Sequence, residues 1–138
     1  MAKGIYTIMR MNTMTNKVSG IGNDIIELAR IRQSIERHGL HFLNRLFLQK
    51  EQDYCYKFQD PVPHFAGYFA AKEAIAKALG TGFGEHLAWH DIEVSHDELG
   101  KPTVHLSTGA QKKFKNTQVL VSISHGTDYA TAVAIAMG

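Results

Sequence analysis

Three acidic residues and a lysine stand in contexts that suit chemistry on a phosphate group. Asp24 ends a glycine-rich apolar stretch, Glu27 follows shortly after it, and Glu73 and Lys77 lie four residues apart in an alanine-rich segment. Two or three carboxylates with open coordination positions suit Mg²⁺, which keeps several waters and accepts phosphate oxygens as further ligands. A neighbouring ammonium would stabilise charge on a departing phosphate.

Each of these residues also has an ordinary structural explanation. Asp24 suits a turn or a helix N-cap, and Glu27 suits the first turn of a helix, where the dipole favours negative charge. A solvated pair of Glu73 and Lys77 would stabilise a helix by only about 0.2–0.5 kcal/mol. Spacing alone leaves both explanations open.

The element that must position two of these residues is a helix predicted from Phe65 to Gly80. It is rich in alanine, the best helix former, and glycines follow it as a stop signal. At about 100° per residue, Glu73 and Lys77 project from one face, roughly 40° apart. Lys72 falls inside the apolar arc of the same helix. A lysine there either extends its ammonium to solvent or is held by a partner.

Helical patterns precede strand patterns along the chain, which predicts an α+β fold with helices packed on an antiparallel sheet. The strand predicted at Val18–Ile26 contains Gly20 and Gly22, and glycine in a strand indicates close backbone approach or a bend. The other expected elements are a helix at 27–38 ended by Gly39, a helical or irregular segment at 42–48, a helix at 50–58, a loop at 60–63, strands at 91–95 and 103–106 around a turn, a helix at 107–115 with Ser107 as N-cap, and strands at 119–124 and 129–136.

Composition bounds the class of protein. The chain has 138 residues, of which 44% are hydrophobic and 20% charged, with a net charge of +2, too mild to indicate nucleic-acid binding. There is no apolar run long enough for a membrane span and no secretory signal. The single cysteine, Cys55, excludes an internal disulfide and favours a reducing, cytoplasmic setting. We expect residues 1–17 to be a flexible extension and 18–138 to form one domain.

The eight histidines form no metal-binding motif, so a zinc site is not indicated. His125 differs from the others because it follows the apolar run 119–124 and opens a short loop, although an ordinary hairpin histidine is an equal alternative. The glycine-rich stretch 80–84 follows a helix. It therefore lacks the strand–loop–helix context of a phosphate-binding loop, and we interpret it as a helix cap and loop.

Four stretches, taken in order, resemble the holo-[acyl-carrier-protein] synthase family, the small 4′-phosphopantetheinyl transferases. No one stretch is decisive, but four in this order at this chain length are specific. The stretches are Gly20–Ile31 (GIGNDIIELARI), Phe69–Gly80 (FAAKEAIAKALG), Gly100–Pro102 (GKP) and Ser122–His125 (SISH).

The resemblance implies transfer of the phosphopantetheine arm of coenzyme A to a serine of an apo acyl carrier protein, a reaction of fatty acid biosynthesis that releases adenosine 3′,5′-bisphosphate. It implies a homotrimer with active sites between subunits, and Mg²⁺ held by Asp24 and Glu73. Catalytic roles are expected for Lys77, His125 and Glu27. The base that takes the serine proton stays open among a metal-proximal water, Glu27, Asp24 and Glu73. The residues expected to bind coenzyme A are Lys72, Lys77, Gly80, Lys101, Pro102 and His125.

Arg30 matches a position at the carrier-docking edge of the family's first helix, and Arg37 shares its polar face, so both are expected to meet an acidic carrier. One departure concerns Tyr68, where many relatives have arginine, so one charge contact to coenzyme A is missing here or supplied elsewhere. Two other functions use the same residues. One is a Mg²⁺-dependent hydrolase of nucleotide pyrophosphates, and the other is a non-catalytic module that binds an acidic helix.

Overall fold

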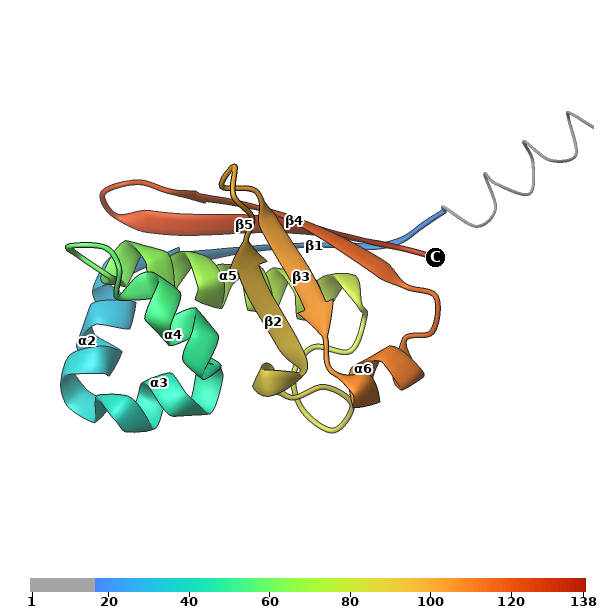
Figure 1. Cartoon of the computed structure of the whole chain (residues 1–138), viewed down its shortest axis with the longest axis horizontal. Coiled ribbons are helices and arrows are strands. Elements are labelled where there is room, and N and C mark those ends of the chain that lie inside the picture. Colours follow the sequence, from blue (N-terminus) through green and yellow to red (C-terminus); the bar gives the residue numbers. More distant parts are fainter. Residues whose placement is uncertain (1–16) are drawn as a thin grey trace, which may run out of the picture.

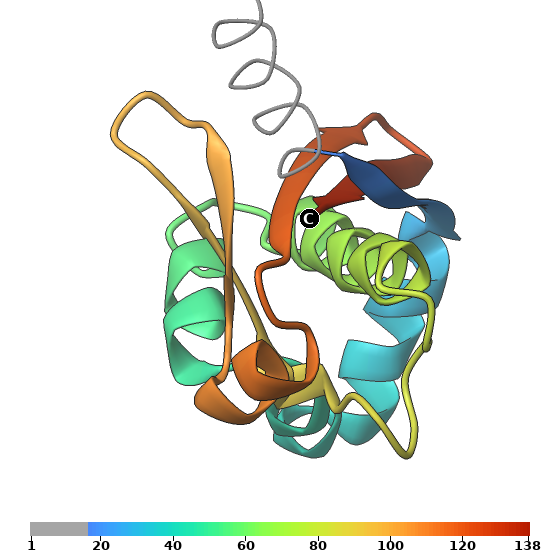
Figure 2. The same ribbon diagram turned by 90° about the vertical axis from the view of Figure 1, so that its right-hand side faces the viewer.

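A long helix, α5 (Val62–Ala78), runs through the middle of the molecule, and the other elements surround it (Figures 1 and 2). The computed structural model describes residues 17–138. Along the chain the other elements are β1 (Val18–Glu27), α2 (Leu28–His38), α3 (Leu40–Leu46), α4 (Gln49–Cys55), a 3-10 helix (Trp89–Asp91), β2 (Ile92–His96), β3 (Pro102–Leu106), α6 (Thr108–Lys113), β4 (Gln118–His125) and β5 (Tyr129–Met137).

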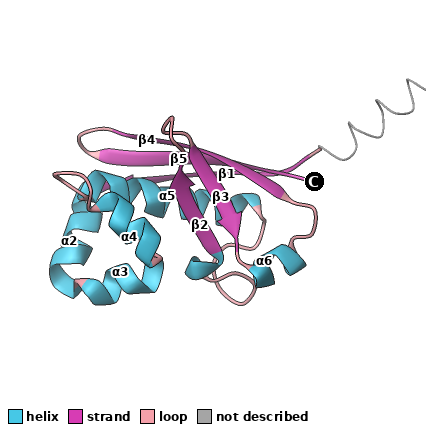
Figure 3. Cartoon of the chain, in the orientation of Figure 1, coloured by secondary structure: helices cyan, strands magenta, loops and turns pink. Residues whose placement is uncertain are grey.

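The strands form two separate antiparallel units, as Figure 3 shows. One is a three-stranded sheet in the order β1–β5–β4, so the first and last strands of the chain are neighbours. The other is the hairpin of β2 and β3. The three-stranded sheet covers one side of α5, while α2, α3, α4 and the hairpin lie around its other sides. This is the predicted α+β arrangement of helices on an antiparallel sheet.

Small residues line the contact between the sheet and α5. Alternate residues of β5 point toward the helix, and all four are buried alanines, Ala130, Ala132, Ala134 and Ala136. The helix is buried nearly all round, because larger apolar side chains such as Phe65 and Ile75 fill its remaining sides. Small side chains on the sheet side bring the helix axis close to the strands.

The closest approach is between β1 and α5, and two glycines permit it. A Cβ atom at Gly22 would lie 2.1 Å from the carbonyl oxygen of Ala74, and one at Gly20 would lie 1.9 Å from that of Ala78. Real Cβ atoms essentially never come this close to a backbone oxygen. The expectation that glycine in this strand marks close backbone approach is therefore confirmed.

Most predicted elements are present within a few residues of their expected ends. Ser107 caps α6, because its Oγ accepts a hydrogen bond from the Ala110 amide at 3.1 Å. The predicted start of the central helix was wrong, since α5 begins at Val62 and includes Pro63 in its first turn. Proline is tolerated there because the first-turn amides have no partner within the helix.

Cys55 is fully buried and packs within the hydrophobic core. Within residues 17–138, no helix combines the length and the apolar character that crossing a membrane requires. Residues 1–16 lie outside the described residues, so the flexible extension stays a prediction.

The β1–α5 contact predicts that Gly22→Ala destabilises the protein. The new methyl group would force β1 away from α5, and overpacking of this kind typically costs about 1–3 kcal/mol. Urea unfolding measures the change. Gly109→Ala is the matched control, because nothing lies within 4 Å of its added methyl group and the site is helical. Equal stability of the two variants would contradict the proposed role of Gly22.

Candidate active site

The β1–α5 contact brings Asp24 and Lys77 together. Lys77 donates hydrogen bonds from Nζ to Asp24 Oδ1 at 3.2 Å and to the carbonyl oxygen of Asn23 at 2.9 Å. Asp24 faces α5 because it lies two residues beyond Gly22 on the same side of the strand. The Lys77 side chain is 50% exposed and that of Asp24 18%, so the pair lies at the surface, within reach of a ligand.

Glu73 lies one helical turn before Lys77 and is half-buried beside the same pair. Burial raises its pKa, the negative charge of Asp24 raises it further, and Lys77 lowers it. Two carboxylates therefore repel each other across this site, and a bound cation would relieve the repulsion. Gly80 follows on the same face of α5 in the left-handed conformation, at φ 86°.

The donor set at this point fits a hard divalent cation. Among residues 17–138, no group of three or more His, Cys, Asp or Glu is arranged to hold a metal ion. Two carboxylates alone match Mg²⁺, which retains waters and completes its shell with phosphate oxygens. Asp24 and Glu73 are the residues that would hold it.

Glu27 does not join these carboxylates. Strand alternation places Asp24 on the sheet face toward α5 and Glu27 on the opposite face, opposite Tyr129. Glu27 instead lines a separate hollow of about 570 Å³ with Arg32 and Asp128. Within one chain Glu27 therefore lies apart from Asp24 and Glu73, and its expected catalytic role stays a prediction.

The other predicted coenzyme residues form a second group. His125 ends β4, which is the sheet edge opposite to β1, and Lys101 and Pro102 lie at the turn between β2 and β3. Two strand spacings, roughly 10 Å, separate β1 from β4. Lys101 and Pro102 also border a cleft of about 910 Å³ between β3 and β4. Within one chain, the predicted site residues thus divide into two groups. The β1 group consists of Asp24, Glu73, Lys77 and Gly80, and the β4 group consists of Lys101, Pro102 and His125.

Sequence reasoning missed a cluster of aromatic and histidine rings that connects the β4 group. The His125 ring lies 5.1 Å from that of His64, which lies 6.3 Å from Tyr54. Tyr54 in turn stacks on His96 at 4.6 Å, and His96 pairs with Pro102 across the hairpin. These rings belong to four different elements and have no regular spacing along the sequence, so no local sequence pattern predicts that they meet.

Tyr68 belongs to the same cluster. Its hydroxyl is 2.8 Å from His96 Nδ1, and Tyr54 stacks on both rings. Burial raises the pKa of Tyr68 and lowers that of His96, so a neutral phenol donates to a neutral imidazole. Tyr68 is committed to this interior contact and brings no charge to the cluster.

Arg30 and Arg37 are exposed on the outer face of α2, as predicted. Leu28 and Ile31 are buried on its inner face. Arg32, between them in sequence, is held by Asp60 at 2.8 Å. The helix thus presents two exposed guanidinium groups on a face turned away from the core.

Comparison with known proteins identifies the family. The family model described as the 4′-phosphopantetheinyl transferase superfamily matches residues 20–134, which include both groups of site residues. The chain belongs to this superfamily. Among curated relatives of this transferase, the holo-[acyl-carrier-protein] synthase of Chlamydia pneumoniae is 53% identical over 117 residues, covering 85% of this chain and 95% of that protein. The synthase of Chlamydia felis is 49% identical over 121 residues, covering 88% and 98%.

Solved structures of holo-[acyl-carrier-protein] synthases share the fold of this transferase. The Helicobacter pylori synthase in complex with coenzyme A has a TM-score of 0.78 and 36% identity, covering 84% of this chain and 98% of that one. The Neisseria meningitidis synthase has a TM-score of 0.80 and 34% identity, covering 86% and 98%. Both likenesses extend over the three-stranded sheet, α5 and the hairpin rather than over a fragment of them.

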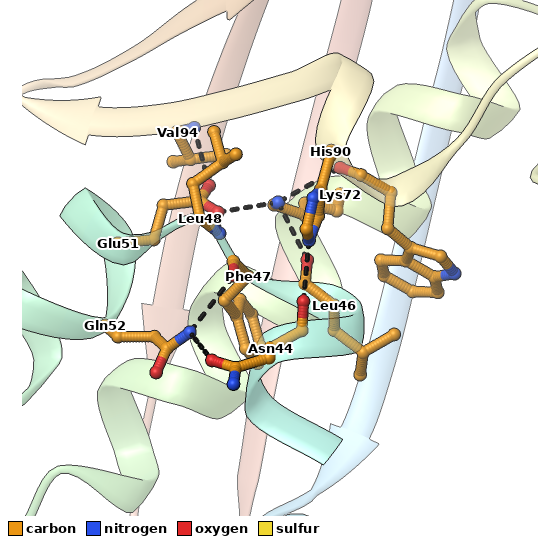
Figure 4. A network of polar contacts seen from close by, with 10 residues as sticks. Asn44, Leu46, Phe47, Leu48, Glu51, Gln52, Lys72, His90 and Val94 are labelled. Carbon is orange, nitrogen blue, oxygen red and sulfur yellow. Dashed lines mark hydrogen bonds and ion pairs between the residues drawn. The ribbon is translucent and has the colours of Figure 1, made fainter. Parts of the chain in front are cut away.

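One predicted coenzyme contact of this transferase needs correction. Lys72 is fully buried, and its ammonium points toward Glu51 and Leu46 in the protein interior (Figure 4). Its Nζ lies 2.7 Å from Glu51 Oε1 and donates hydrogen bonds to the carbonyl oxygens of Leu46 at 2.9 Å and Trp89 at 3.1 Å. All three ammonium protons have acceptors, so none is left for a coenzyme phosphate.

Glu51 is satisfied equally well from the other side of this ion pair. Its Oε1 accepts a hydrogen bond from the Leu48 amide at 2.7 Å, and its Oε2 accepts one from the Val94 amide at 2.9 Å. Burial lowers the pKa of Lys72, and Glu51 opposes that shift. The pair joins α4, α5 and β2, so Lys72 is held by a partner and has a structural role.

Removal of one member of this pair should strongly destabilise the fold. Lys72→Met leaves the Glu51 carboxylate buried without its cation, which typically costs about 3–5 kcal/mol. Lys72→Met combined with Glu51→Gln should recover part of that loss, because no uncompensated charge remains. Chemical denaturation of the three proteins tests this, and a single variant within about 1 kcal/mol of wild type would contradict it.

Proposed function

We propose that Asp24, Glu73 and Lys77 form the reaction centre of a holo-[acyl-carrier-protein] synthase. The enzyme transfers the 4′-phosphopantetheine group of coenzyme A to a serine of apo acyl carrier protein and releases adenosine 3′,5′-bisphosphate. The observation that carries this proposal is the ion pair of Asp24 with the half-exposed Lys77, beside a Glu73 carboxylate whose pKa both residues shift, within the residues that match the transferase family.

In this reaction the serine oxygen bonds to the phosphorus that carries pantetheine, and the bond from that phosphorus to the bridging pyrophosphate oxygen breaks. The serine gives its proton to a base, for which water, Asp24, Glu73 and Glu27 are the candidates, and the leaving bisphosphate gains negative charge. Catalysis of such a displacement depends mainly on positioning and on neutralising charge. Lys77 is suited to the second task because half of its side chain is exposed and its present partner is only a surface carboxylate.

We further propose that Asp24 and Glu73 hold Mg²⁺ during turnover. The raised pKa of Glu73, caused by burial and by Asp24, supports a site that gains from a divalent cation. When bound, the ion would neutralise charge on the pyrophosphate oxygens. Asp24 and Lys77 would then separate, which leaves the ammonium available to the leaving group.

The division of the site into two groups supports a composite active site in a homotrimer. The β1 group and the β4 group lie on opposite edges of the sheet. A head-to-tail contact would bring the β1 group of one copy to the β4 group of the next, and repetition of that contact closes a ring. His125, Lys101 and Pro102 would then bind coenzyme A whose pyrophosphate lies at Asp24 and Glu73 of the adjacent copy.

An exposed apolar surface supports the same assembly. The sheet face turned away from α5 carries large apolar side chains, of which Ile21 is 70% exposed, Ile25 61% and Val133 44%. Contiguous exposure of this kind marks an interaction surface. Leu120 extends it onto β4, and Tyr129 extends it along β5. We assign this face to contacts between copies of the chain.

Arg30 and Arg37 are proposed to dock the carrier. Both guanidinium groups are exposed, and an acidic helical carrier is complementary to them. Cys55 is buried as a free thiol, which supports the proposal that the enzyme works in the reducing cytoplasm. There the reaction would serve fatty acid biosynthesis.

Mass spectrometry of a mixture of coenzyme A, MgCl₂ and apo carrier tests the function directly. Transfer adds the mass of phosphopantetheine to the carrier and releases adenosine 3′,5′-bisphosphate. Free phosphopantetheine with an unmodified carrier would instead indicate a pyrophosphate hydrolase. Carrier binding without either product would indicate a non-catalytic module.

EDTA should abolish transfer, because it removes the Mg²⁺ that Asp24 and Glu73 are proposed to hold. Full activity in EDTA would refute the proposed Mg²⁺ site.

Lys77→Ala should lower kcat by roughly 10²–10³, the effect of removing one preorganised charge-stabilising group. KM for coenzyme A should change less, because the leaving phosphate gains its charge mainly in the transition state. Steady-state kinetics at saturating Mg²⁺ measure both quantities. Lys112→Ala, on the surface of α6, is the control and should keep wild-type values. A folded Lys77→Ala protein with wild-type kcat would refute this role.

Val133→Glu should convert the trimer into monomers, because it places a charge in the centre of the apolar sheet face. Sedimentation equilibrium measures the mass. Leu40→Glu is the matched control, since Leu40 is 66% exposed but lies on α3, away from the sheet. A monomeric wild type, or a trimeric Val133→Glu protein, would argue against this interface.

A further inference from the structure

His64, at the start of α5, lies between the residues of the β4 group although no sequence pattern assigned it there. Its ring is 5.1 Å from that of His125 and meets it nearly edge-on, at 73°. On its other side, His64 stacks on Phe58 at 3.5 Å, which fixes the plane of the imidazole. The cluster continues through Tyr54 to His96, next to Pro102. His64 is therefore central to this half of the site.

The ring nitrogens of His64 and His125 make no hydrogen bond to any group in the described part of the chain, residues 17–138. Most polar side chains in this cluster are engaged, as His96 is by Tyr68 and Asp60 by Arg32. His64 is half-buried and His125 exposed, so their nitrogens border solvent. Two adjacent imidazoles with no hydrogen-bonded acidic partner form a site for an oxyanion when they are protonated.

The charged and titratable groups around His64 come from each element packed against it. His125 belongs to β4 and His96 to β2, while Asp60 lies in the loop before α5. Tyr54 belongs to α4, and Lys57 follows it, with its Nζ 5.9 Å from the centre of the Tyr54 ring. Asp60 is already bound by Arg32 and by the Val62 amide, so its charge is largely compensated.

Coenzyme A carries two separate phosphate groups, the reacting pyrophosphate and a phosphomonoester on the ribose. The proposed function places the pyrophosphate at Asp24 and Glu73, whereas the histidine pair belongs to the other half of the site. We propose that His64 acts with His125 to bind the phosphomonoester, and that this contact makes coenzyme affinity fall as pH rises. The inference rests on the proposed function, because it takes coenzyme A as the ligand.

The direction of the pH effect follows from the protonation of His64. Burial lowers its pKa below the ordinary 6.5, the neighbouring His125 and His96 lower it further, and Asp60 raises it. A phosphate dianion bound at the solvent-facing side of the two rings would favour the protonated form of His64, so binding takes up protons near neutral pH. As pH rises from 6 to 8 the proton concentration falls, so protonation of His64 becomes less favourable and coenzyme binding weakens.

Calorimetric titration of the intact protein, without carrier and therefore without turnover, tests this inference. Coenzyme A is compared with dephospho-coenzyme A, which lacks only the phosphomonoester, at pH 6.0 and 8.0. His64→Gln should weaken coenzyme A binding about tenfold at pH 6.0, near the lower end for one charge-assisted hydrogen bond, and about twofold at pH 8.0. Dephospho-coenzyme A affinity should change less than about twofold, because the partner of His64 is absent.

Two further variants make the experiment decisive. His64→Lys keeps a cation that does not titrate in this range, so it should retain tight coenzyme A binding at pH 8.0 and flatten the pH dependence. His41→Gln, an exposed histidine on α3, should behave as wild type with both ligands. Titration in buffers of different ionisation enthalpy should show proton uptake by wild type and less by His64→Gln.

The outcomes separate this inference from the function on which it rests. Equal weakening of both ligands by His64→Gln would mean that the residue only supports the fold, and would overturn the inference. Unchanged coenzyme A affinity in a folded His64→Gln protein would overturn it as well, with the transferase function intact. Failure of the wild-type protein to bind either ligand would instead refute the proposed function.

Discussion

The contact between the backbone of β1 and the backbone of α5 determines where the charged groups of this protein lie. Glycine at positions 20 and 22 removes the only atoms that would separate the two elements. Asp24, next on the same side of the strand, then reaches Lys77 across a gap that larger residues would widen. Each ångström of added separation would weaken both the ion pair and a shared cation site, because the attraction between opposite charges falls as their distance grows.

Much of this arrangement could be predicted from sequence because it is encoded locally. The alanine-rich run defines the central helix, and helical spacing then fixes Glu73 and Lys77 on one face. What could not be predicted depends on tertiary structure. Glu51 and Lys72 meet only because α4 packs against α5, and nothing in either segment specifies the other. The separation of Glu27 from Asp24 likewise depends on strand parity at the β1–α2 junction, where the sequence pattern changes from strand to helix.

The histidine cluster was hidden for a related reason. Its rings come from the ends of α4, α5, β2 and β4, which converge at one end of the molecule. Element ends have no periodicity, so sequence patterns identify the elements and not the side chains that meet where they stop. The same ends carry His125 and Pro102, which explains how an unassigned residue such as His64 comes to lie between two assigned ones.

Lys72 and Lys77 lie on the same helix but have opposite roles, one structural and one available to a ligand. Lys72 is fully buried, with three acceptors at 2.7, 2.9 and 3.1 Å, so moving its ammonium would leave a buried carboxylate without a cation. Lys77 is half exposed, and surface pairs such as its contact with Asp24 contribute only about 0–1 kcal/mol. Its ammonium can therefore turn from Asp24 to an incoming phosphate at little cost. Burial fixes the first lysine as part of the fold, and exposure leaves the second free to act on a substrate.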